Sequence, residues 1–404
     1  MKLKKILPVL LSVLFLTGAV FITSTAPKKS EKESRRSTAA VGNPSPELPD
    51  ETRGLWVTYM TLDVENEADK RAAFEKKLDA ITNDAVKGNF NTLIVQVRPF
   101  CDAIYPSEFF PWSHIISGTQ GVDPGFDPLA LIVEKCQQNG LYLHAWINPY
   151  RVATAQTPAE LSDRSPVTED EALGVEINGS IYLDPASEKT QKLIADGVRE
   201  LAEKYDIDGI QFDDYFYPEN CGDFDKAEYL RYLEENGEQI SIEEFRKNNV
   251  SKMVSEAYAA AHEADSDILF GISPQGNLRN NDGLYADVEA WSAEEGYIDY
   301  ICPQIYFSLD NPALTFEDCL SEWLSLKKHK GLRLFVGLSG YKAGTDADDG
   351  TWLDNHDILQ TEIGILRQQH TDGWILYSYD SLHNEENSEE IQNVIRYLTT
   401  SAVQ

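Results

Sequence analysis

Eight short apolar runs alternate with amphipathic segments between residues 53 and 400, and this alternation constrains the fold most strongly. The runs are rich in β-branched and aromatic residues, which favour strands. The predicted strands are Leu55–Met60, Thr92–Val97, Tyr142–Asn148, Gly209–Phe216, Ile268–Ser273, Ile298–Phe307, Leu334–Leu338 and Trp374–Tyr379. Strands that alternate with helices predict a parallel sheet, and eight of them predict a closed α/β barrel, the (β/α)8 TIM barrel. An open doubly wound sheet is the alternative, but no glycine-rich phosphate loop follows the first strand.

Helices between these runs have recognisable ends. Asp127-Pro128 predicts an N-cap followed by proline in the first helical turn, and Asp184-Pro185 predicts the same arrangement before a helix over residues 188–205. Thr315 is expected to start a helix that ends with the cations of residues 327–329, which suit the negative end of the helix dipole.

The longest predicted loops follow the second, third and fourth strands, over residues 101–128, 150–180 and 218–241. Loops that follow the strands of a parallel barrel all lie at its C-terminal face, where barrel active sites are built. These loops are rich in aromatic residues, which either pack the loops or offer flat apolar faces to sugar rings. The sequence therefore predicts an active site at this face.

The fourth predicted strand runs directly into two adjacent carboxylates, Asp213 and Asp214, and Pro218 ends it. Burying a carboxylate is costly unless it is paired or hydrogen-bonded, so the pair indicates either a catalytic cleft or a solvated turn. Because side chains alternate along a strand, Asp213 shares the polar face of Gln211 and Tyr215 and is expected to point into the barrel mouth. Asp214 is expected to face a neighbouring strand or a helix N-terminus unless the strand twists.

Five further strand ends carry polar side chains where a purely structural strand would not. Any one of them could belong to the core, but five on one face indicate a site. With Tyr215, the candidate residues are Arg98, Asp102, His144, Asn148, Tyr150, Arg151, Gln304, Tyr306 and Asp380. Gln275 and Tyr377 stand at the same strand ends.

The N-terminal 26 residues predict export, because a lysine-rich start precedes an apolar run of 17 residues from Ile6 to Ile22. A run of this length is also at the short edge of a membrane span, so the segment is predicted to be either a signal peptide or a retained membrane tether. Residues 27–50 predict a flexible linker, and residues 51–400 predict the barrel. We therefore expect an extracellular or cell-envelope protein.

The composition bounds the possible partners. The formal net charge of −32 makes nucleic acid an unsuitable partner, because like charges repel. Five scattered cysteines show no zinc-type spacing, and their odd number means that they cannot all pair within one chain. Histidines are few, and the acidic run over residues 346–350 does not match the EF-hand pattern. We predict neither a metal site nor a cofactor.

Several segments resemble the family called glycosyl-hydrolase-like ten. They are Tyr105–Ser113 with Asp123–Pro128, Leu143–Val152 and Asp208–Pro218, and Gly271–Gly276 also fits. The resemblance covers about residues 53–399 and implies a barrel related to glycoside hydrolases. It also implies a polysaccharide substrate, a cell-wall glycan such as peptidoglycan strands from which the peptides have been removed.

A more distant resemblance is to family 18 chitinases, whose fourth strand carries Asp-Gly-x-Asp-x-Asp-x-Glu. Gln211 and Asp213 stand at the two inner aspartates of that pattern, and Tyr215 stands at the acid glutamate. The proton donor of such an enzyme is therefore missing from its usual place, and another carboxyl group must supply the proton.

A glycosidase needs one carboxyl group as the acid and a second as nucleophile or base. We predict that Asp213 and Asp214 are catalytic, with Asp102 and Asp380 as alternatives for the second role. The remaining candidate residues would bind hydroxyl and acetamide groups of the sugar. The alternatives to a glycosidase are a glycan-binding barrel without catalysis and a metal-dependent deacetylase.

Overall fold

The computed structural model describes residues 49–401 except 219, 238 and 354, and it confirms the predicted barrel. Eight parallel strands within these residues close in the order β1-β11-β10-β9-β8-β7-β3-β2. They are β1 (Thr52–Val57), β2 (Thr92–Arg98), β3 (Tyr142–Ile147), β7 (Gly209–Phe212), β8 (Leu269–Ile272), β9 (Tyr300–Ile301), β10 (Arg333–Ser339) and β11 (Gly373–Tyr377). The predicted signal or anchor, residues 1–26, lies outside the described residues, as does nearly all of the predicted linker.

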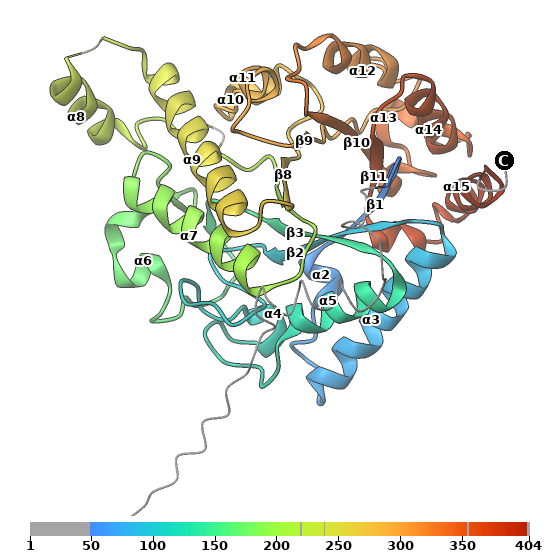
Figure 1. Ribbon diagram of the computed structural model, residues 1–404, viewed down its shortest axis with the longest axis horizontal. Coiled ribbons are helices and arrows are strands. Elements are labelled where there is room, and N and C mark those ends of the chain that lie inside the picture. The colour runs from blue at the N-terminus through green and yellow to red at the C-terminus, as the bar shows by residue number, and fades with distance from the viewer. Residues whose placement is uncertain (1–48, 219, 238, 354, 402–404) are drawn as a thin grey trace, which may run out of the picture.

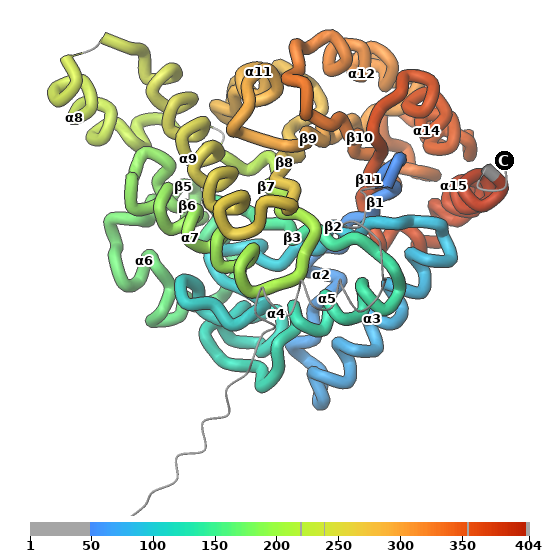
Figure 2. The backbone as a smooth tube through the Cα atoms, viewed as in Figure 1, coloured from blue at the N-terminus to red at the C-terminus, as the bar shows by residue number. Residues whose placement is uncertain are grey.

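Helices surround the barrel as an outer ring (Figure 1), and the tube in Figure 2 follows the same path from strand to helix. The longer ones are α3 (Lys70–Lys87), α5 (Pro128–Asn139), α7 (Glu188–Lys204), α8 (Lys226–Asn236), α9 (Ile242–Ala264), α12 (Phe316–Ser325), α14 (Ile358–Gln368) and α15 (Ser388–Ser401). The short ones are α2 (Tyr59–Leu62), α4 (His114–Ser117), α6 (Pro166–Glu169), α10 (Asn280–Gly283), α11 (Val288–Ala293) and α13 (Ala347–Gly350). None of the helices in the described part of the chain is long and apolar enough to cross a membrane.

The loop after β3 is more ordered than the sequence predicted. It forms a small antiparallel sheet of β4 (Arg151–Ala153), β5 (Gly174–Ile177) and β6 (Ser180–Leu183), in the order β4-β6-β5. These strands are short and only partly buried, so they lack the long apolar runs that mark the barrel strands.

Two barrel strands, β7 and β9, are much shorter than predicted. β7 ends at Phe212, and past this point the Phe216 amide donates to the Asp214 carbonyl (3.1 Å) instead of to a neighbouring strand. β9 spans only two residues, because Pro303 has no N–H to donate to a ladder. Beyond Pro303 the chain keeps its place in the barrel through isolated bridges from Gln304.

The predicted helix ends are confirmed in part. Asp127 caps α5 through the Ala130 amide (3.0 Å) as expected. The cap of α7 is Ser187 and not Asp184, because residues 184–187 first form a turn in which the Ser187 amide donates to the Asp184 carbonyl (3.1 Å). The helix that starts after Thr315 ends at Ser325, and the Lys328 ammonium reaches back to the Trp323 carbonyl (2.8 Å). This cation thus lies at the negative end of α12 although it is outside the helix.

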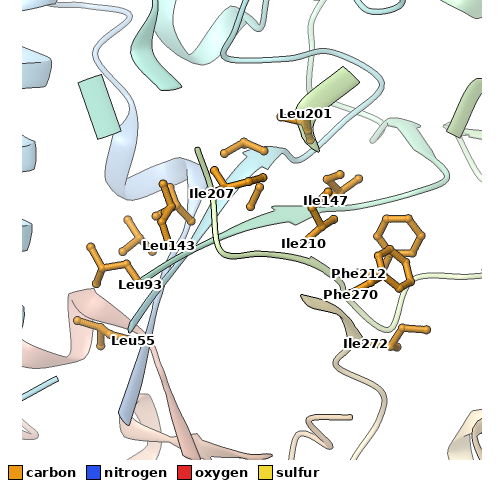
Figure 3. Close-up of a cluster of buried hydrophobic side chains, with 14 of the residues drawn as sticks. Leu55, Leu93, Leu143, Ile147, Leu201, Ile207, Ile210, Phe212, Phe270 and Ile272 are labelled. Carbon is orange, nitrogen blue, oxygen red and sulfur yellow. The ribbon is translucent and has the colours of Figure 1, made fainter. Parts of the chain in front are cut away.

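The core has two layers, because side chains alternate between the inside and the outside of each strand. The inner layer is a cluster of large side chains that fills the barrel: Trp56, Ile94, Trp146, Tyr300, Cys302, Phe335 and Ile375. The outer layer packs the strands against the helices, and Figure 3 shows members of it along the strands, with Leu201 entering from α7. Gly271 makes room for the Tyr300 ring, since a Cβ there would lie 2.3 Å from it. All five cysteines are buried and unpaired.

The last two helices, α14 and α15, bury two carboxyl groups. Glu390 of α15 accepts a hydrogen bond from the Leu359 amide (2.6 Å) in the first turn of α14, and burial raises its pKa to about 7. Glu362 of α14 is fully buried beside it, and its carboxyl oxygens accept no hydrogen bond from any residue that the structure describes. Burial raises the pKa of Glu362 well above its ordinary value, and Glu390 adds to the shift.

These groups make stability depend on pH. The folded protein holds Glu362 protonated, while the unfolded chain ionises it near pH 4.5, so folding takes up a proton above that pH and stability falls as the pH rises. We predict that Glu362→Met raises the free energy of unfolding by roughly 1–3 kcal/mol at pH 8 and by less at pH 5. Urea titration at both pH values measures the difference. An equal gain in stability at both pH values would contradict this prediction. Glu362→Gln is the control, because it removes the titratable proton but keeps a polar side chain at the same place.

Candidate active site

A pocket of about 330 Å³ opens at the C-terminal face of the barrel. Its described lining comes from nearly every barrel strand end and consists of Trp56, Trp146, Gln211, Asp213, Asp214, Tyr215, Ser273, Gln275, Gln304, Tyr306, Tyr341 and Tyr377. Two of these side chains are carboxylates and six are aromatic. The pocket thus combines titratable groups with flat apolar walls, but its aromatic residues do not come from the three long loops that the sequence singled out.

Asp213 is held on the side of β3. The indole Nε1 of Trp146 donates to its Oδ2 (3.0 Å), and the amide of Asn148 donates to the same oxygen (3.2 Å). The backbone amide of Tyr215 donates to the other oxygen (3.3 Å). Because alternate residues of β3 point inward, the sequence His-Ala-Trp-Ile-Asn over residues 144–148 brings both side-chain donors to this carboxylate.

Asp214 is held on the opposite side, by the loops that follow β8 and β9. The side-chain amides of Gln275 and Gln304 donate to its two carboxylate oxygens, and the bond from Gln304 is 3.3 Å long. Asp214 was expected to turn toward a neighbouring strand or a helix. It does reach the neighbouring strand ends, but it also lines the pocket, because β7 ends at Phe212 and the alternation of side chains ends with it.

The pKa values of both carboxyl groups are raised in the pocket. Burial is the main cause that raises the pKa of Asp213, the negative charge of Asp214 adds to it, and the pKa reaches about 7. Burial also raises the pKa of Asp214, although the amides of Gln275 and Gln304 oppose the shift. The Arg151 guanidinium favours the ionised form of both. It lies 4.8 Å from the Phe100 ring and 5.3 Å from the Tyr215 ring.

The candidate residues that the structure brings together are Asp213, Asp214, Tyr215, Gln304 and Tyr306, which line the pocket. Two more candidate residues lie outside the pocket lining but interact with the carboxylates. Asn148 binds Asp213, and Arg151 is held by the Pro99 carbonyl (3.0 Å) beside Tyr215.

Five predicted substrate-binding residues neither line the pocket nor act on its two carboxylates. Arg98 is buried against the Phe110 ring (4.2 Å), because a register shift between Gln96 and Arg98 turns it out of the barrel toward α7. Tyr150 is buried in the outer layer of the core. His144 lies inside the barrel below the pocket, 3.0 Å from the Tyr300 hydroxyl, and burial lowers its pKa to about 4.

The other two are the alternative second carboxylates. Asp102 is fully buried and pairs with His114 (3.2 Å) and Gln120 (3.1 Å). Asp380 is exposed and accepts a hydrogen bond from Thr61 (2.8 Å). Of the three candidates for the second catalytic carboxyl group, Asp214 is therefore the one that shares the pocket with Asp213.

The predicted set of site residues left out several members of the lining. Gln211, Gln275 and Tyr377 were recognised at the strand ends but were not counted as site residues. Trp56, Trp146 and Ser273 were left out, although they stand on predicted strands whose inward alternation could have found them. Tyr341 gave no such signal, because it lies in a short 3-10 turn after β10, where strand alternation no longer applies. The described residues hold no group of three or more His, Cys, Asp or Glu side chains that could bind a metal ion.

Comparison with known proteins agrees with this geometry. The family model described as glycosyl hydrolase-like 10 matches residues 51–354. Glycosyl hydrolase YngK of Bacillus subtilis (strain 168) is 32% identical over 340 residues, which is 79% of this chain and 66% of that protein. Glycosyl hydrolase DigH of Escherichia coli (strain K12) is 27% identical over 373 residues, 85% of this chain and 83% of that protein.

Solved structures support the fold. The glycoside hydrolase domain of PgaB (BpsB) from Bordetella bronchiseptica has a TM-score of 0.55 at 12% identity, covering 85% of this chain and 99% of that one. The endo-β-1,4-mannanase of Thermotoga petrophila has a TM-score of 0.52 at 12% identity, covering 87% and 77%. The predicted TIM barrel and the predicted enzyme class are both confirmed, and the chain belongs to the glycosyl hydrolase-like 10 family of barrel glycosidases.

Proposed function

We propose that this enzyme hydrolyses a cell-wall glycan, namely peptidoglycan strands from which the peptides have been removed, with Asp213 and Asp214 as its catalytic carboxyl groups. The observation that carries this proposal is the pair of buried, adjacent carboxylates in an aromatic pocket. Hydrolysis of a glycosidic bond needs two carboxyl groups at the bond, one with a proton and one without.

Asp213 is the proton donor in this proposal. A pKa of about 7 leaves a large fraction of its carboxyl groups protonated near neutral pH, which suits a general acid. When the glycosidic C–O bond breaks, the leaving oxygen takes the proton of Asp213. The hydrogen bonds from Trp146 and Asn148 then stabilise the carboxylate that remains.

Asp214 is the ionised partner. Two side-chain amides donate to its oxygens, and hydrogen bonds to the charged form favour that form. Its negative charge stabilises the positive charge that develops at the anomeric carbon as the bond breaks. Water then forms the new C–O bond at that carbon, and the proton that it loses restores the protonated Asp213. Burial and the charge of Asp214 thus favour the protonated form of Asp213, while the amide donors of Gln275 and Gln304 favour the carboxylate form of Asp214.

The aromatic residues would hold the sugar ring over these groups. Tyr306, Tyr341 and Tyr377 form a cluster with ring centroids 5.9–6.0 Å apart, and Trp56 stands 5.9 Å from Tyr377. Such rings offer apolar faces to the C–H face of a sugar and hydroxyl groups to its polar edge. Tyr341 is 45% exposed and Tyr215 is 52% exposed, so ring faces remain available at the rim.

The cell-wall substrate and the location outside the cytoplasm rest on the sequence. The motifs of residues 105–128, 143–152 and 208–218 resemble a family with members that act on peptide-free peptidoglycan. The lysine-rich start and apolar run of residues 2–22 are typical of export, with or without a retained membrane tether.

Asp213→Asn tests the role of the acid. The amide cannot donate the proton, so kcat should fall by roughly 10²–10⁴-fold while the fold is retained. Release of new reducing ends from peptide-free strands measures the rate. The matched control is Asp380→Asn, which removes an exposed carboxylate outside the pocket and should keep near wild-type turnover. Near wild-type turnover by Asp213→Asn would contradict the assignment of Asp213 as the proton donor.

The pH dependence gives a second test. The acid must be protonated, and its folded pKa is raised to about 7, so kcat/KM should decline above that pH by about tenfold per pH unit. An initial-rate series between pH 5 and pH 9 on peptide-free strands measures this limb. A profile that stays flat to pH 9 would contradict Asp213 as the proton donor.

A further inference from the structure

A second cavity, of about 650 Å³, adjoins the catalytic pocket, and Gln275 lines both. Its walls come from the loop after β7, from α9 and from the loop after β8. Polar residues line most of it, among them Asn220, Arg246, Arg279 and Asn280. We call it the Arg279 cavity. The two cavities are therefore neighbours, with Gln275 at their common border.

The Arg279 cavity is cationic in a strongly acidic chain. Its described lining contains two arginines and no carboxylate, whereas the whole chain has a formal net charge of −32. Arg246 is buried and already paired with Asp225 (2.6 Å), so its charge is balanced. Arg279 is exposed, and its guanidinium makes no ion pair with any residue in the described part of the chain. The charge open to a ligand is therefore that of Arg279.

The wall around Arg279 is held firmly in place. Arg246 donates to the Tyr285 hydroxyl (2.8 Å) and to the Gly222 carbonyl (2.6 Å), which ties the loop after β7 to the loop after β8. Tyr285 and Asn220 both have left-handed backbones, with φ of 56° and 57°. A bulky residue such as tyrosine rarely adopts this region, and such positions cluster at functional sites.

The same loop connects the cavity to the catalytic carboxylates. Asn281 is buried, and its side chain bonds both backbone groups of Gln275, with the amide at 3.1 Å and the carbonyl at 3.0 Å. The side chain of Gln275 donates to Asp214. Arg279 follows Gln275 by four residues, so a group bound by Arg279 is placed relative to the catalytic site by one rigid loop.

We propose that the Arg279 cavity is a subsite for a carboxylate carried by the sugar strand, an inference that rests on the proposed function. The planar guanidinium matches a carboxylate with two parallel hydrogen bonds. In peptidoglycan, the lactyl group of every muramic acid residue is an amide while a peptide is attached. Cleavage of that amide leaves a free carboxylate, so this subsite selects strands that have lost their peptides.

The experiment compares two versions of the same strands. One is peptide-free and keeps its lactyl carboxylates, and the other has those carboxylates converted chemically to neutral methylamides. The wild type should show a higher kcat/KM on the acidic strands. Arg279→Gln should reduce this preference by roughly tenfold, the size expected for one charge-assisted hydrogen-bonded pair, and Arg279→Lys should restore part of it. Arg199→Gln is the control, because it removes a partly exposed arginine of α7 that pairs with Glu263 (2.8 Å) and lines neither cavity.

The outcomes separate the subsite from the proposed function. If Arg279→Gln lowers kcat/KM equally on both strands, or on neither, the subsite is wrong while the hydrolysis stands. If the wild type cleaves neither, binding of the two strands is measured by calorimetry instead. If the acidic strands bind more weakly to Arg279→Gln than to the wild type, the subsite stands and the hydrolysis is rejected. If acidic and neutral strands bind equally well, both the subsite and the hydrolysis are rejected.

Discussion

The burial of two adjacent carboxylates at the edge of the barrel is the constraint on which the active site depends. Asp213 and Asp214 are 3% and 7% exposed, and ionising both side by side is costly. Each of the two carboxyl groups has its own hydrogen-bond partners. The Trp146 and Asn148 side chains hold one carboxyl group, and the Gln275 and Gln304 amides hold the other. Each carboxyl group is therefore fixed separately, which suits the proposed roles of Asp213 as the acid and Asp214 as the carboxylate.

The barrel interior supports this geometry from below. Trp146 belongs to the inner cluster and to the pocket at once, so packing in the barrel fixes the donor that binds Asp213. One layer deeper, the Tyr300 hydroxyl lies 3.0 Å from His144 and 3.4 Å from the Gln211 side chain. The low pKa of His144 keeps it neutral near pH 7, so its ring adds no charge beneath the carboxylates. A histidine that the sequence predicted to bind substrate thus lies in the interior of the barrel instead.

The sequence predicted the barrel because every barrel strand is an apolar run with a helix after it. It predicted that Asp213 points into the barrel mouth, because the alternation of side chains along β7 continues for one residue past Phe212. It misplaced Arg98, because a one-residue register shift in β2 reverses the direction of a side chain and leaves no mark in an apolar pattern. It missed Tyr341 and left the second carboxylate open, because loops and turns bring those residues to the mouth, and tertiary contacts rather than periodicity set their positions.

The most direct test of the account is the mass of the products formed from peptide-free glycan strands in ¹⁸O-labelled water. Hydrolysis predicts shorter strands in which each new reducing end carries one ¹⁸O atom. Strands that stay bound and uncut would contradict the account and identify a glycan-binding barrel. Shorter strands without the label would also contradict it, because the bond would then have been broken without water.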